Sequence, residues 1–481
     1  GAFLTPDPEG GETTTTTAAH RAESPALPQP DSPPRFGGGA FDRHVTRWND
    51  NCVFCHNVAP NPGWDAAAAV FRTTVSELGI ACEACHGPGG THVTRNQDDP
   101  LRRYTVRLSG GADPTIVNPA RLSPGRAADV CGRCHGQRIS DDVASVRAHG
   151  DPFVPGDDLG LYTAPLWRDT ALGGDRQAFA ARFWNDGTPR LTAYEYQGLL
   201  QSACAARGTL TCTTCHGMHD GAPRGQLRPA ARGDGACTGC HVALGSLEAR
   251  AAHTHHDPAG TGARCVSCHM PRLVYGVLDA HRSHRIENPD PARAVAMGRP
   301  DACTLCHVDA DRAWAVRERE RLWPSPAGSA SVVVSASAAT RPVQGGAPID
   351  LLAPRDGLFA GDPVARALAA DAIGRAPWPA DLARAREAAG TRTAALLEVA
   401  ASDRYPAVRH LAARALDRIL TARGSPAAVE ARRFDATAPE VDRRRIVGAI
   451  REQLHTNGAR DPARIAQLRK VARTADIDIG E

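Results

Sequence analysis

The sequence predicts a mainly α-helical protein with much irregular coil, in which a loop-rich region comes first and a small domain of α-helical repeats follows. Two observations predict the first part. A five-residue Cys/His pattern recurs seven times before residue 310, and 46 glycines and 37 prolines interrupt long regular elements. A third observation predicts the second part: from Asp350 onward cysteine is absent, and Ala, Leu and Arg dominate with apolar residues at helical spacing.

The recurring pattern is Cys-x-x-Cys-His, and it uses fourteen of the fifteen cysteines. In chain order, the first to seventh motifs are Cys52, Cys55 and His56 (CVFCH); Cys82, Cys85 and His86 (CEACH); Cys131, Cys134 and His135 (CGRCH); Cys212, Cys215 and His216 (CTTCH); Cys237, Cys240 and His241 (CTGCH); Cys265, Cys268 and His269 (CVSCH); and Cys303, Cys306 and His307 (CTLCH).

This pattern is typical of c-type haem attachment: the two thiols form thioethers with the porphyrin, and the histidine ligates the iron. Zinc ribbons do not need a histidine after each cysteine pair, and thioredoxin-like sites use a single pair. A disulfide framework would leave an odd cysteine and unexplained histidines. The sequence therefore predicts seven haem c groups. Only 256 residues run from Cys52 to His307, so the rings are expected to lie close together and to supply much of the apolar core.

The second axial position of each iron is filled by a side chain in an electron carrier, whereas an enzyme keeps one such position open for its substrate. The three methionines are poor candidates, because Met218 and Met270 stand beside motifs and only Met297 remains. We predict histidine at this position, since ten further histidines precede residue 310. The assigned second ligands are His44, His92, His149, His219, His253, His256 and His284. Spacing alone does not separate His255 from its neighbours in the HTHH cluster, and His20 and His281 are treated as spares.

The chain is expected to have four segments. Residues 1–40 form a low-complexity arm, residues 41–323 the heptahaem domain, residues 324–349 a linker with a short strand at Ser331–Ser335, and residues 350–481 a HEAT-like repeat domain. The repeats are inferred from three apolar helical faces, the first and second offset by 43 residues: Leu368 and Ile373 after Asp362-Pro363; Val408, Leu411, Ala412, Ala415, Leu416 and Ile419 after Pro406; and Ile446, Ile450 and Leu454.

The remaining features bound location and partners. His410 and His455 are expected to be surface or packing residues of the repeats, and Cys204 a small buried residue. The net charge of +3 gives no indication of nucleic-acid binding. The sequence contains no run of 18 apolar residues, so no transmembrane helix is expected. Gly1 is interpreted as a mature N-terminus, with no signal peptide in the sequence. Since haem c is attached outside the cytoplasm, we expect an exported protein, periplasmic or at the cell surface.

Three stretches resemble multihaem cytochromes c with C-terminal TPR or HEAT repeats. They are FWNDGTPRLTAYEYQGLLQSACAARGTLTCTTCHGMHDG, ACTGCH followed by AHTHH, and CVSCHMPRLVYGVLDAHRSHRIENPDP leading to DACTLCHVDADRAW. CEACHGPGGTH also resembles this group and the wider set that contains nitrite and hydroxylamine enzymes. The resemblance implies bis-histidine haems with His92, His219, His284 and one HTHH histidine as second ligands. Many such chains have Arg-Asp-His-Ser where this one has Arg282-Ser283-His284-Arg285.

Two functions remain in competition. The first, which we favour, is electron transfer along closely spaced haems without a catalytic residue, with redox proteins or further copies of the chain, as a filament, for partners. The second is a reductase of nitrite, hydroxylamine or a sulfur oxyanion, which needs one iron with an open position. The surplus of histidines and the absence of the C-x-x-C-K variant that pentahaem nitrite reductases use at their active haem favour the carrier. A scaffold that binds through its repeats is a third, weaker hypothesis.

Overall fold

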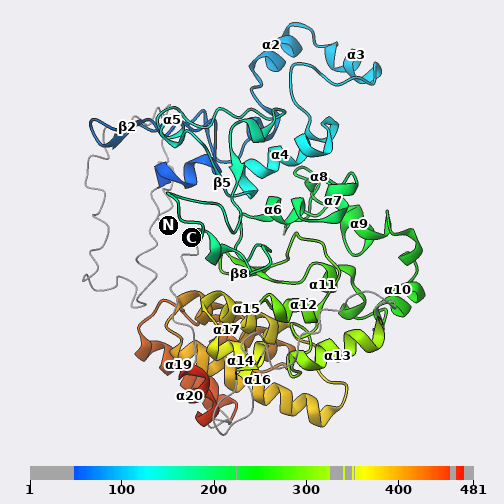
Figure 1. Cartoon of the computed structure of the whole chain (residues 1–481), viewed down its shortest axis with the longest axis vertical. Helices are drawn as coiled ribbons and strands as arrows, with labels where there is room; N and C mark the ends of the chain where they lie inside the picture. Colours follow the sequence, from blue (N-terminus) through cyan, green and yellow to red (C-terminus); the bar gives the residue numbers. More distant parts are fainter. Residues whose placement is uncertain are drawn as a thin grey trace. The chain divides into compact units, whose positions relative to one another are not determined.

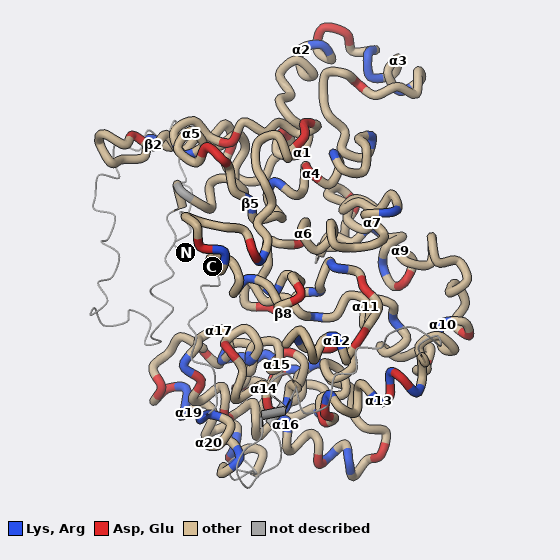
Figure 2. The backbone as a smooth tube through the Cα atoms, in the orientation of Figure 1, with Lys and Arg blue, Asp and Glu red and all other residues tan. Residues whose placement is uncertain are grey.

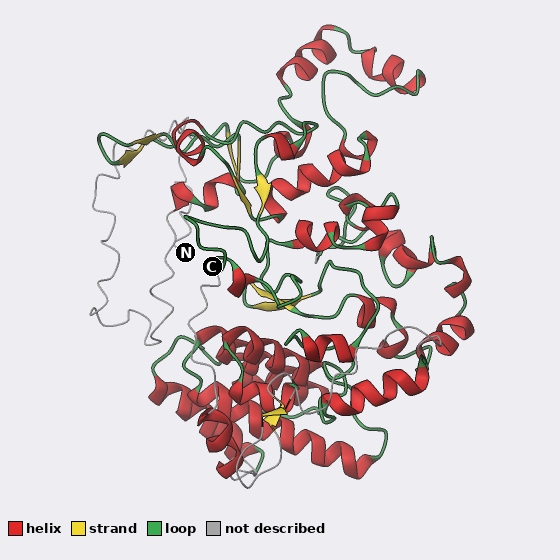
Figure 3. Ribbon diagram, in the orientation of Figure 1, coloured by secondary structure: helices red, strands yellow, loops and turns green. Residues whose placement is uncertain are grey.

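The computed structural model describes residues 48–223, 225–324, 340–341, 349–350, 353–455 and 462–470. The predicted arm with His20, as well as His44 and the Ser331–Ser335 strand, lies outside the described residues, as does most of the 324–349 linker. The described chain is mainly α-helical, with long coil stretches and only short two-stranded sheets (Figure 3), which confirms the predicted fold class of a mainly α chain with much coil.

The chain divides into two compact units. Among the described residues, the first unit comprises 48–122 and 139–164, and the second comprises 123–138 and 165–470. The first and second motifs therefore belong to the first unit, and the third to seventh motifs belong to the second.

The first unit is built from short elements (Figure 1). Its helices and strands are α1 (Glu83–His86), α2 (Gly90–Asp98), α3 (Arg102–Leu108), α5 (Val143–His149), β1 (Asn57–Val58), β2 (Trp64–Asp65), β3 (Val70–Phe71) and β4 (Glu77–Leu78). β1 pairs with β4 and β2 with β3, both antiparallel. Between residues 74 and 122 only two glycines, Gly87 and Gly89, are buried, so the polypeptide supplies no apolar core there.

The motif-bearing part of the second unit also consists of short helices joined by loops. They are α4 (Pro124–His135), α6 (Glu195–Leu200), α7 (Ala203–Arg207), α8 (Cys212–Cys215), α9 (Gly235–Thr238), α10 (Leu247–Thr254), α11 (Cys265–His269), α12 (Pro291–Ala296) and α13 (Arg312–Leu322), with the antiparallel strands β7 (Val274–Gly276) and β8 (Asp279–His281). The short strands β5 (Arg138–Ile139) and β6 (Ala164–Pro165) stand where the chain passes between the units.

The rest of the second unit is a stack of longer helices preceded by a two-stranded antiparallel sheet. The elements are β9 (Thr340–Arg341), β10 (Ile349–Asp350), α14 (Pro354–Ala360), α15 (Pro363–Arg375), α16 (Leu382–Ser402), α17 (Pro406–Ala422), α18 (Ala428–Arg432), α19 (Glu440–Gln453) and α20 (Pro462–Lys470). α15 and α16 both pack against α17, and α19 packs against α16. Figure 2 marks the charged residues of this stack; in α19, Glu440 and Asp442 of the first turn are followed by the exposed Arg444 and Arg445.

Two of the predicted helices begin where the sequence indicates. α15 starts at Pro363, and the Asp362 side chain caps it by accepting a hydrogen bond from the Ala365 amide at 2.9 Å. α17 starts at Pro406, and its predicted apolar face is at most 1% exposed at every position, which confirms the amphipathic helix. His410 is partly buried on α17, and His455 is exposed just beyond α19. The HEAT-like repeat itself stays a prediction.

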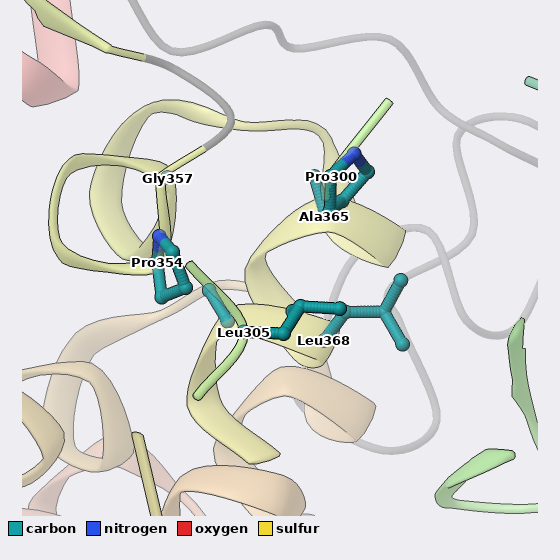
Figure 4. Close-up of a pocket in the computed structure, with 7 residues that line it drawn as sticks. Pro300, Leu305, Pro354, Gly357, Ala365 and Leu368 are labelled. Carbon is teal, nitrogen blue, oxygen red and sulfur yellow. The ribbon is translucent and has the colours of Figure 1, made fainter. Parts of the chain in front are cut away.

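These helices pack directly on the motif-bearing part of the second unit. Leu305 lies between the two cysteines of the seventh motif. With Pro300, it lines a small apolar pocket together with Pro354 of α14 and Leu368 of α15 (Figure 4). Ion pairs reinforce the contact: Arg190–Asp362 at 2.6 Å, Arg392–Asp309 at 2.6 Å and Arg414–Asp279 at 3.3 Å. The seventh motif is therefore held by α14 and α15 as well as by its own loops.

Candidate haem-binding sites

Each motif folds into one tight helical turn. The histidine amide donates to the carbonyl of the first cysteine in the motifs that begin at Cys52, Cys82, Cys212, Cys237 and Cys303, at 2.8–3.1 Å. The third and sixth motifs lie within α4 and α11. Since residues four apart share one face of a helix, the turn brings the first cysteine and the histidine to the same side. None of the fifteen cysteines, all of which lie among the described residues, forms a disulfide.

The ring nitrogens of several motif histidines are already oriented. Nδ1 of His86 is 2.6 Å from the Val117 carbonyl oxygen, Nδ1 of His216 is 2.7 Å from that of Gly225, and Nδ1 of His269 is 2.9 Å from that of Glu287. A carbonyl oxygen only accepts, so Nδ1 carries the proton and Nε2 keeps its lone pair. Metal-ligating histidines commonly have this arrangement, in which the second nitrogen fixes the tautomer and the ring orientation.

Three motif histidines each face a second histidine from elsewhere in the second unit. His216 of the fourth motif lies opposite His284, with ring centroids 6.2 Å apart and an interplanar angle of 26°. His269 of the sixth motif lies opposite His253, at 6.2 Å and 9°. His307 of the seventh motif lies opposite His256, at 6.1 Å and 39°.

This separation fits two imidazoles that share one metal ion. A metal–nitrogen bond is about 2.0 Å, and a ring nitrogen lies about 1.1 Å from its ring centroid, so two rings in line across a metal are about 6.2 Å apart. The residues present therefore fit an iron held by two histidines at the fourth, sixth and seventh motifs. Within the described residues, no group of three or more His, Cys, Asp or Glu could hold a metal ion.

The HTHH cluster divides because of its backbone. α10 ends at Thr254, and His255 adopts the left-handed conformation with φ of 55°, which turns the chain at the end of the helix. His253 thus faces the sixth motif and His256 the seventh, while the His255 ring lies edge-on against Trp323 at 5.1 Å. Nδ1 of His256 is 2.6 Å from the Thr254 carbonyl oxygen, which leaves its Nε2 for a metal.

The other predicted second ligands are placed less specifically. His92 lies on α2, and its Nδ1 is 3.3 Å from both Asp113 Oδ2 and Thr115 Oγ1. Burial tends to raise the pKa of Asp113, but Thr115 and Arg102 outweigh it and lower this pKa to about 2. His149, at the end of α5, and His219, just after the fourth motif, are exposed. Among the described residues, no ring contact pairs the exposed motif histidines His56 and His241 with a second histidine.

Two residues that the sequence left open have local roles in the structure. Nε2 of His281 is 2.9 Å from the Gly276 carbonyl oxygen across the β7–β8 hairpin, so this nitrogen already has a partner. Cys204 lies on α7 and is only partly buried, not buried as expected for a small free cysteine.

Close helix packing positions His284 and the third motif. Gly132, inside the third motif, allows the ring of Tyr196 to approach, since a Cβ at Gly132 would lie 2.5 Å from that ring. Gly198 lies on α6, as Tyr196 does, and faces the backbone of His284 and Arg285. A Cβ at Gly198 would lie 3.0 Å from that backbone. The Tyr196 hydroxyl donates to Asp129 of α4 at 2.7 Å. α6 is thus the support shared by the third motif and the His284 segment.

The Arg282-Ser283-His284-Arg285 segment is held by a network of four charged residues, of which Arg299 is buried. Arg285 lies 3.3 Å from Asp186 and 3.4 Å from Glu287, and Arg299 lies 3.0 Å and 2.5 Å from the same two carboxylates. Ser283 is buried, and its amide donates to the Pro271 carbonyl at 2.8 Å. These four charges fix the loop that carries His284.

Sequence reasoning missed two charged residues beside the motifs. Glu195 Oε2 lies 3.5 Å from Nδ1 of His135 in the third motif. Burial tends to raise the pKa of Glu195, but the His135 contact and the charge of His284 outweigh it, and the pKa is lowered to about 2. Arg282 donates to the carbonyls of Val266 and Met270, at the sixth motif. Burial and neighbouring arginines lower the pKa of Arg282 to about 10. No motif pattern marks Glu195, whereas Arg282 stands in the segment that departs from the resembling chains.

Comparisons with known proteins add one structural likeness. No protein-family model matches the chain, and no curated protein matches it. The crystal structure of the outer cell wall cytochrome OcwA is similar with a TM-score of 0.40 and 18% identity, over 85% of this chain and 77% of that one.

Proposed function

We propose that this chain carries seven covalently attached haem c groups and transfers electrons between them. The observation that carries the proposal is the set of three histidine pairs, each with one motif histidine and each at the separation that two imidazoles take across one metal. The seven motifs and the hydrogen-bonded Nδ1 atoms support it. Bound haem supplies a one-electron Fe(III)/Fe(II) couple.

The proposed ligands follow from these contacts. His284, His253 and His256 are the second ligands at the fourth, sixth and seventh motifs, opposite His216, His269 and His307. His92, His149, His219 and His44 remain the predicted second ligands for the other sites. An iron held by two histidines has no free position for a substrate, which favours a carrier over an enzyme.

Location and partners are proposed from the same chemistry. Covalent haem attachment takes place outside the cytoplasm, so we propose an exported protein, either periplasmic or at the cell surface. None of the helices in the described part of the chain has the length and apolar character to cross a bilayer. The proposed partners are redox proteins or further copies of this chain, assembled as a filament. We also retain the proposal of a HEAT-like repeat domain over residues 350–481 as the docking surface.

The experiment that tests the function has two parts. Mass spectrometry of the purified holoprotein should show seven haem additions to one chain. Low-temperature EPR of the oxidised protein, with and without nitrite or cyanide, should show only low-spin signals that the added ligands leave unchanged. A high-spin signal of about one haem that shifts with ligand would replace the carrier by the reductase of nitrite, hydroxylamine or a sulfur oxyanion.

A further inference from the structure

The five motifs of the second unit follow one another in space in their sequence order. α4, with the third motif, packs against α8, with the fourth, and residues Pro229–Ala231 pack against both α8 and α9, which begins the fifth. Asp234, just before the fifth motif, accepts a hydrogen bond from the amide of Cys265, which opens the sixth, at 2.9 Å. The sixth and seventh motifs are linked by the end of α10, where His253 faces the sixth motif and His256 the seventh.

A carboxylate stands at the beginning of this series. Glu195 Oε2 is buried and faces Nδ1 of His135 at 3.5 Å, while Glu195 Oε1 accepts a hydrogen bond from Thr192 at 3.0 Å. Arg138 is also near the third motif, with its guanidinium over the Tyr196 ring. A carboxylate on the second nitrogen of a ligating imidazole makes that ligand more basic and so favours the oxidised metal.

A guanidinium stands near the other end. Arg282 is bound to carbonyl oxygens at both ends of the sixth motif, with Met270 at 3.0 Å, and its charge also acts on the Cys306 thiol of the seventh. Within the described residues no carboxylate forms an ion pair with it, and Arg272 lies close enough to add positive charge. A cation near a redox centre favours the reduced form, and the effect is strong where water is excluded.

Two carboxylates beside the fifth and seventh motifs are compensated by arginines. Asp234, at the fifth motif, pairs with Arg264 at 3.3 Å and with Arg250 at 3.8 Å. Asp301, just before the seventh motif, pairs with Arg312 at 3.4 Å and accepts from Thr304. Glu195 and Arg282, by contrast, carry opposite charges beside the two ends of the series.

We propose that Glu195 and Arg282 give the five sites of the second unit a direction, with reduction potentials that are low at the third motif and high at the sixth and seventh. This rests on the proposed function, because it assigns haem to these motifs. Electrons would then run along the sites in sequence order, from the third motif toward the seventh. Both residues are tuning residues, which act through a ligand or through space and do not touch a substrate.

The test is a potentiometric titration of the holoprotein, followed by visible absorbance. Glu195→Gln should raise the lowest-potential part of the curve, and Arg282→Gln should lower the highest-potential part, so that each variant narrows the total span. Glu195→Gln should also change the g values of one low-spin EPR signal. Glu318→Gln and Arg293→Gln, which neutralise charges on α13 and α12, are the matched controls and should leave both ends in place.

Conservative variants distinguish an effect of the side-chain charge on the reduction potentials from an effect of the substitution on folding. Arg282→Lys keeps the charge and should restore the high-potential end, and Glu195→Asp should recover part of the shift at the low end. A variant that has seven haems by mass and a titration curve like the controls would overturn the gradient while leaving the proposed function intact. A chain with fewer than seven haems in the unsubstituted protein would instead overturn the proposed function.

Discussion

The division of the HTHH cluster gives the sharpest test of the site geometry. His253→Ala and His256→Ala each remove one ring of a pair, at 6.2 Å from His269 and at 6.1 Å from His307. The thioethers and the motif histidine remain, so each variant should leave one iron five-coordinate and high-spin. That iron is about one-seventh of the haem, and the double variant should convert about two-sevenths.

The matched control is the residue between them. His255 packs on Trp323 and has φ of 55°, so His255→Asn preserves the left-handed turn, which asparagine tolerates, and should produce no high-spin signal. The assay is the integrated high-spin EPR signal of each oxidised variant, together with its haem count. A high-spin signal from His255→Asn, or none from His253→Ala, would refute the assignment.

Three further predictions concern stability, measured by chemical denaturation. Arg299→Ala leaves Asp186 and Glu287 with Arg285 as a remaining partner and should lower the free energy of unfolding by about 1–3 kcal/mol. Burial tends to raise the pKa of Asp362, but Arg190 outweighs burial and lowers this pKa below 3.8. The stability that the Arg190–Asp362 pair contributes is therefore present above pH 3.8 and is lost as the pH falls further. Asp362→Asn should remove this pH dependence of the free energy of unfolding. Gly198→Ala, against the His284 backbone, should cost about 1–3 kcal/mol, whereas Gly448→Ala, in open space on α19, should stabilise by about 0.5–1 kcal/mol; equal effects would contradict the packing argument.

The sequence predicts what depends on local spacing. Residues three and four apart decide both the one-turn motif and the buried face of α17, so the cysteine sites and this helix follow from the pattern alone. The partner of each motif histidine depends on chain folding over long distances. The choice among His253, His255 and His256 rests on one left-handed residue, which the sequence does not mark. Glu195 reaches the third motif only because α6 packs against α4.

The pairing of His216 with His284 has a consequence for how the chain matures. The two histidines are 68 residues apart, and the fifth and sixth motifs lie between them. His253 and His256, by contrast, precede the motif histidines that they face. In a chain that is exported N-terminus first and loaded as we propose, the sixth and seventh sites meet a waiting ligand as soon as they emerge. The fourth site must wait for a later part of the chain, which makes it the slow step of assembly and the first place to look for incompletely matured protein.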